Sequence, residues 1–153
     1  MKNIFKFAAM AFAAVVMFAS CDKKDDKTPD APAATLDGKV LKVTVENMGD
    51  IYFDFGKFAA NQITMGMDGA MYGMEGTIIA INPLGSYVVK ATDATSGVIT
   101  RTVAVGDGTS VSQDVPYSGL TETSCTIDLI LISMEGTATG EFVDATLVDP
   151  YAE

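Results

Sequence analysis

Residues 41–55 read LKVTVENMGDIYFDF, and apolar and polar side chains alternate along them with a period of two. Every second residue from Leu41 to Val45 is aliphatic, and NMGD then interrupts the pattern before it resumes from Ile51 to Phe55. Alternation of this kind is typical of a strand with one buried and one solvated face. The stretch therefore predicts two strands joined by a turn, a β-hairpin.

The rest of the chain continues this period. Turn formers such as Asp68-Gly69, Asn82-Pro83 and Gly106-Asp107-Gly108 separate the apolar runs, and no segment has the 3.6-residue period of an amphipathic helix. We therefore predict one all-β domain over residues 35–153, either a small antiparallel meander β-barrel or a β-sandwich. The further strand-like runs are NQITMGM (61–67), GTIIAIN (76–82), SYVVKAT (86–92), GVITRTVAV (97–105), TSVSQDV (109–115), SCTIDLILIS (124–133) and GEFVDATLV (140–148).

The N-terminus has the features of a signal peptide. Lys2 and Lys6 precede an uncharged apolar run over residues 7–19, which is shorter than the roughly 20 residues that a spanning helix needs. We expect residues 1–20 to be a leader. Residues 21–34 hold no apolar side chain large enough to build a core, and we expect them to form an acidic, Pro- and Ala-containing tether.

The five residues Met17-Phe18-Ala19-Ser20-Cys21 resemble a bacterial lipobox. This resemblance implies that Cys21 receives a diacylglyceryl group on its sulfur, becomes the new N-terminus and is acylated on its amine. It also implies a lipid-anchored protein, because two or three acyl chains hold a protein stably on a membrane.

The charges that follow, DKKDD at 22–26, resemble the export signal of Bacteroidetes-type surface lipoproteins. That resemblance implies the outer leaflet of the outer membrane, whereas an aspartate directly after the cysteine implies inner-membrane retention in enterobacterial lipoproteins. We expect a surface-exposed protein of the outer membrane, and the periplasmic face remains the alternative. The number of strands and their hairpin order resemble calycin or lipocalin-like barrel lipoproteins, although the chain has no tryptophan and thus no Gly-x-Trp motif.

Composition narrows the function. A net charge of −10 argues against nucleic acid as a partner, because phosphate backbones would repel the chain. The chain has no histidine, which excludes Ser-His-Asp and Cys-His machinery and histidine-based zinc sites. We therefore expect a protein that is not an enzyme and has no cofactor. With Cys21 lipidated, Cys125 has no disulfide partner, and its apolar surroundings predict a buried, inert thiol.

Two features are candidates for ligand binding. With Asp68-Gly69 as a two-residue turn, Met65 and Met67 share a strand face with Ile63, so we expect them to line a core or a ligand pocket. A methionine-rich Cu(I) site is the weaker alternative, because the four methionines between residues 65 and 74 would then lie on two faces.

Arg101 is the only arginine. It would bind an acidic ligand at a barrel mouth if the odd-numbered face of its strand points inward, and it would be merely solvated if that face points outward.

The sequence MEGT occurs at 74–77 and again at 134–137, in a sixty-residue register that also aligns Asp68 with Asp128. Either chance or a duplicated hairpin explains this echo. Taken together, the chain is expected to be a surface lipoprotein whose domain binds a hydrophobic small molecule or a glycan without catalysis. The alternative is a structural or protein-interaction module that presents a strand edge or loop to a partner protein.

Overall fold

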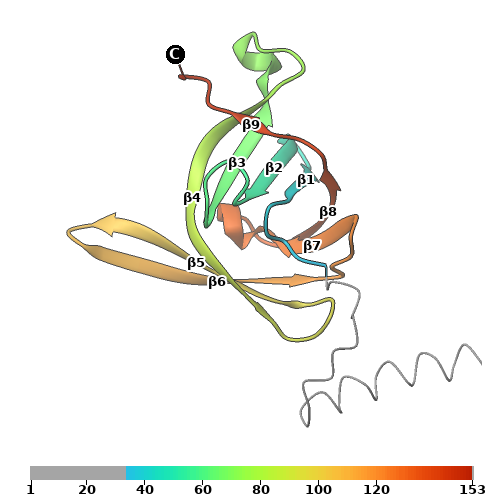
Figure 1. The fold of residues 1–153 in the computed structure, drawn as a ribbon, viewed down its shortest axis with the longest axis vertical. Coiled ribbons are helices and arrows are strands. Elements are labelled where there is room, and N and C mark those ends of the chain that lie inside the picture. Colours follow the sequence, from blue (N-terminus) through green and yellow to red (C-terminus); the bar gives the residue numbers. More distant parts are fainter. Residues whose placement is uncertain (1–33, 153) are drawn as a thin grey trace, which may run out of the picture. The chain divides into compact units, whose positions relative to one another are not determined.

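The computed structural model describes residues 34–152, and Figure 1 shows them as a barrel of strands. The expected leader (1–20), the expected lipidation site Cys21 and all but the last residue of the tether lie outside the described residues. Within residues 34–152 no helix is both long and apolar enough to cross a membrane.

The described chain contains nine strands and two single-turn 3₁₀ helices, which are labelled η. The first half holds β1 (Val40–Val45), β2 (Gly49–Phe55), β3 (Gln62–Asp68), η2 (Gly69–Tyr72) and β4 (Ile78–Ala91). The second half holds β5 (Gly97–Gly106), β6 (Thr109–Ser118), β7 (Ser124–Asp128), η3 (Leu129–Ile132), β8 (Thr137–Val143) and β9 (Leu147–Val148).

Strands β1 to β8 form an antiparallel meander in which each strand pairs with the next one along the chain. The sheet closes because β8 also pairs with β1, with Val40 opposite Val143 and Lys42 opposite Glu141. The predicted small antiparallel meander β-barrel is thus confirmed, and the sandwich alternative is wrong. The short β9 pairs in parallel with the start of β4.

Closure between β1 and β8 depends on Gly140. A Cβ at this position would lie 2.5 Å from the main-chain oxygen of Lys42 and within 3 Å of the side chains of Leu41 and Val43. Only a residue without a side chain lets the two strands approach this closely.

Odd-numbered side chains fill the barrel interior, as the alternation predicted for residues 41–55. Leu41, Phe53, Ile99 and Val115 are fully buried on this face, and so is the thiol of Cys125. Residues that pair in neighbouring strands lie on the same face of the sheet, so the buried face continues from each strand to the next around the barrel. The centre of the barrel is therefore a packed core.

Two of the expected strand runs are in fact one strand. The runs at 76–82 and 86–92 both belong to β4, so the turn predicted at Asn82-Pro83 is wrong. Pro83 lies opposite Thr64 in β3, beside a register shift, where a residue without an N–H donor is tolerated. Gly85 has a φ of 113° and its ideal Cβ would lie 2.4 Å from the carbonyl oxygen of Thr102, so it allows β4 to bend against β5.

The run at 124–133 is also not a single strand, because β7 ends at Asp128 and η3 follows. The same happens sixty residues earlier, where η2 replaces the two-residue turn expected at Asp68-Gly69. Each aspartate accepts a hydrogen bond from the main-chain N–H two residues further on, at 2.8 Å for Asp68 and 2.9 Å for Asp128. Each helix ends on a left-handed residue, Gly73 or Ser133.

The sixty-residue register extends beyond MEGT. It places β1 on β5, β2 on β6, β3 on β7, η2 on η3 and the start of β4 on β8 along the sequence. The wall of the barrel thus repeats a unit of four strands and one 3₁₀ helix, although the two helices point differently. In η3 Leu129 and Leu131 are buried against the core, whereas Met71 and Tyr72 in η2 are exposed.

Candidate binding site at the barrel mouth

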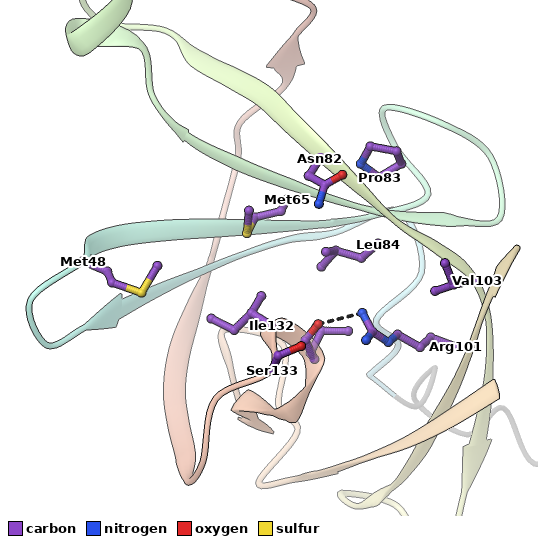
Figure 2. Close-up of a pocket in the computed structure, with 10 residues that line it drawn as sticks. Met48, Met65, Asn82, Pro83, Leu84, Arg101, Val103, Ile132 and Ser133 are labelled. Atoms are coloured by element: carbon purple, nitrogen blue, oxygen red, sulfur yellow. Dashed lines mark hydrogen bonds between the residues drawn. The ribbon is translucent and has the colours of Figure 1, made fainter. Parts of the chain in front are cut away.

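A pocket of about 350 Å³ lies where β4 and β5 separate at one end of the barrel. The two strands pair from Ala91–Gly97 up to Ser86–Thr102, and beyond this point β5 pairs only with β6. Figure 2 shows that η3 lies beside this gap. The pocket exists because the wall opens above the packed core and η3 fills only part of the opening.

Most of the pocket wall is apolar. Met48 comes from the β1–β2 turn, Met65 from β3, Leu84 from β4 and Val103 from β5 (Figure 2). Met48 is half exposed at the rim, whereas Leu84 is buried. Among residues 34–152, no aromatic residue lines the pocket. Such a surface suits a hydrophobic group, and flexible methionines adapt to its shape.

Arg101 supplies the positive charge in this apolar setting. Its strand face is the one that carries Ile99, so of the two orientations that the sequence left open the structure shows the inward one. Arg101 Nε donates a hydrogen bond of 2.7 Å to Gln113 Oε1, its cross-strand neighbour on β6. Nη1 donates one of 2.8 Å to the main-chain oxygen of Leu131 in η3.

The guanidinium of Arg101 has no carboxylate partner among residues 34–152. The two ion pairs in this part of the chain join Lys42 to Asp50 and Lys57 to Asp144. Two of the five guanidinium N–H groups are used in the contacts just described, which leaves three for solvent or a ligand. Burial lowers the pKa of Arg101, but arginine keeps its charge in proteins. The pocket therefore holds a partly desolvated cation that forms no ion pair within the described part of the chain.

The predicted methionines separate in space. Met65 lines the pocket and packs against the core, whereas Met67, further along β3 on the same face, does not line it. Met71 is 86% exposed on η2, far from the environment of a shared metal site. The structure thus does not bring the four methionines to one place. Within the described residues no cluster of three or more acidic or cysteine side chains is arranged to hold a metal ion.

Sequence reasoning missed the part of the site that η3 provides. SCTIDLILIS reads as one apolar strand, and only the aspartate before LILI signals a helix cap. The role of Gln113, which orients Arg101, could not be predicted from the sequence either, because it depends on the register between β5 and β6.

A second group of polar side chains, around Asp54 at the end of β2, has a structural role. Asp54 is fully buried, and its Oδ1 accepts hydrogen bonds from the main-chain N–H groups of Lys57 and Phe58, which closes the β2–β3 loop. The Tyr87 hydroxyl donates to Asp37 just before β1. Burial first, and then this hydrogen bond, raise the pKa of Tyr87. The hydrogen bond between Tyr87 and Asp37 attaches the segment before β1 to the barrel.

Comparison of the chain with models of protein families, with curated proteins and with solved structures gave no match. The assignment of a function therefore rests on the pocket and on the residues around it.

Proposed function

We propose that this protein is a lipid-anchored surface lipoprotein whose barrel binds a small amphiphilic anion, without catalysis, in the pocket beside Arg101. The single observation that supports binding is the unpaired guanidinium of Arg101 in the wall of an otherwise largely apolar pocket. A partly buried cation is costly unless an anion or hydrogen bonds compensate it. A ligand carboxylate would accept the N–H groups that Gln113 and Leu131 leave free.

The size of the pocket limits the ligand. At roughly 30 Å³ for each water-sized group, 350 Å³ holds about a dozen non-hydrogen atoms. The tail of the ligand would lie against Met48, Met65 and Leu84 at the mouth, because side chains fill the barrel centre. A medium-chain carboxylate fits this description.

Glycan binding is the weaker of the two expected ligand classes. Sugars stack on exposed aromatic rings, but Tyr87 and Tyr117 are buried and no tyrosine lines the pocket. The hydrophobic small molecule is therefore the better candidate.

Binding is tested with dodecanoate and with 1-dodecanol, which has the same chain but no charge, by titration calorimetry. The protein used lacks residues 1–20 and carries Cys21→Ser. We expect Arg101→Gln to weaken dodecanoate binding at least tenfold and to change dodecanol binding by less than about threefold, because only the carboxylate loses its partner.

The matched control is Lys90→Gln, which removes one positive charge from an exposed position on β4. It should leave the binding of both molecules unchanged. Equal affinity of dodecanoate for the Arg101→Gln variant and the parent protein would reject the proposal, as would a failure of the parent protein to bind dodecanoate. Mass spectrometry of molecules that co-purify with the parent protein gives an independent view of the natural ligand.

The anchor is tested separately by labelling cells with radioactive palmitate. We expect the parent protein to carry the label. The labelled protein should be in the membrane fraction and accessible to protease on intact cells. Cys21→Ser should abolish both the label and the membrane association. A labelled protein that resists protease on intact cells would place the anchor on the periplasmic face.

A further inference from the structure

The hairpin formed by β5 and β6 leaves one strand edge free. Strand β6 pairs with β5 from Thr109 to Tyr117, but it pairs with β7 only at Tyr117 and Ser118. Its other edge, residues 109–116, has no strand partner among the described residues. Figure 1 shows the tip of this hairpin extending away from the barrel. Alternate residues along the edge therefore present unpaired main-chain groups.

From Thr109 to Gln113 this edge lacks the usual features that keep strands apart. Natural proteins protect free edges with charged side chains, prolines or bulges. From Gly108 to Gln113 the edge carries no charge, its only proline is Pro116 near the barrel, and the bulge lies on β5. The hairpin also exposes apolar side chains, with Val105 59% and Val111 56% exposed.

The distribution of charge around this edge allows a second copy of the chain to pair with it. With a net charge of −10, two copies repel each other unless they meet through a neutral segment. The segment Gly108–Gln113 is neutral and lies between Asp107 and Asp114. An antiparallel register that places Val111 opposite Val111 of a second copy would put Asp114 opposite Gly108, so no aspartate faces another.

We propose that two copies of this chain associate through antiparallel pairing of their β6 edges, centred on Val111. Such an interface is two-fold symmetric and so satisfies both edges at once. It also extends the apolar strip, because Val111 pairs with Val103 on β5 and Val103 lines the mouth pocket. In the dimer, Val103 and Val111 of one copy would continue into Val111 and Val103 of the other. One row of valines would then connect the rims of the two mouth pockets.

The experiment is sedimentation velocity over a range of concentrations, on the chain without residues 1–20 and with Cys21→Ser. The parent protein should show a monomer–dimer equilibrium. Val111→Lys places two lysines opposite each other and should raise the dissociation constant at least tenfold. Val111→Glu should do the same, and an equimolar mixture of the two variants should recover a dimer, because unlike charges then meet at the centre.

Val88→Lys is the matched control, since Val88 is an exposed valine on β4, 69% exposed and outside the hairpin. It should leave the dimer intact. A parent protein that stays monomeric at 1 mM would overturn the proposal, as would a dimer that survives Val111→Lys. Hydrogen exchange distinguishes a dimer from an edge that is covered within one chain. If the β6 amides are protected equally at all concentrations, another segment of the same chain covers the edge and the proposal fails.

Discussion

Arg101 Nη1 donates a hydrogen bond of 2.8 Å to the main-chain oxygen of Leu131, and this contact joins the barrel wall to the helix that partly closes its mouth. Leu131 itself is fully buried. The same turn of η3 therefore anchors in the core with its side chain and orients the charged group of the pocket with its carbonyl oxygen. If the pocket binds a ligand as proposed, stability and ligand binding are linked at this position.

The first prediction concerns the packing of η3. Leu131→Ala should lower the free energy of unfolding by about 2–4 kcal/mol, because it removes a fully buried side chain and leaves a cavity. Ile130→Ala, in the same helix but 38% exposed, should cost less than about 1 kcal/mol. Urea denaturation of both variants checks the difference, and similar losses would contradict the view that η3 is anchored by Leu131.

The second prediction separates the two helix caps. Asp128→Ala and Asp68→Ala each remove a hydrogen bond to the main-chain N–H two residues on, and each should cost about 1 kcal/mol. Only Asp128 precedes a helix that lines the pocket. Calorimetry should therefore show weaker dodecanoate binding for Asp128→Ala alone. Equal weakening in both variants would mean that the cap of η3 has no special role at the site.

The third prediction concerns closure of the barrel. Gly140→Ala should lower the free energy of unfolding by about 1–3 kcal/mol, because its Cβ would meet the main-chain oxygen of Lys42 at 2.5 Å. The neighbouring exposed change Thr139→Ala removes a hydroxyl contact with Thr126 and should cost less than about 1 kcal/mol. Thermal unfolding compares the two. A neutral Gly140→Ala would show that β1 and β8 need not approach so closely.

The fourth prediction is a pH dependence that arises from Cys125. Burial raises the pKa of this thiol to about 11, against 9.0 for the free group. The unfolded chain therefore releases the proton first, so the stability that the neutral thiol contributes is complete below pH 9 and is lost as the pH rises to 11. Two pKa units correspond to about 2–3 kcal/mol.

The measurement compares the parent protein with Cys125→Ala by urea denaturation from pH 8 to pH 11. Tyr87 also has a raised pKa and weakens the fold above pH 10 in both proteins. The parent should nonetheless lose up to about 2 kcal/mol more than the variant. Parallel curves for the two proteins would contradict a buried, neutral thiol at Cys125.

Much of the wall could be predicted because a strand's side-chain period is local. The alternation from Leu41 to Phe55, and the turn at Gly106-Asp107-Gly108, appear in the structure as expected. The expected boundaries at Pro83 and at LILI (129–132) were wrong for the same reason. The local sequence at each place is compatible with more than one structure, and contacts with other strands determine which one forms. Pro83 stays in β4 because its place opposite Thr64 adjoins a register shift, and LILI turns inward because the barrel offers it a core.

The candidate site was predictable only in part. Arg101 and Met65 were chosen from their residue types and both line the pocket, whereas Met67 does not, although it shares a strand face with Met65. Residues on one strand face lie at different positions along the barrel axis. The position of the pocket on this axis depends on where β4 and β5 separate. No local pattern encodes that point.

By itself, then, the amino-acid sequence determined an all-β chain with alternating faces from Leu41 to Phe55, a single cysteine in the domain and a resemblance to lipid-anchored proteins in the leader. Only the tertiary structure decided that the sheet closes and that, within residues 34–152, Arg101 points inward without a carboxylate partner and β6 keeps a free edge. The physical reason is that alternation depends on neighbours two residues apart, whereas closure, pairing and burial of a charge depend on strands that are distant in the chain.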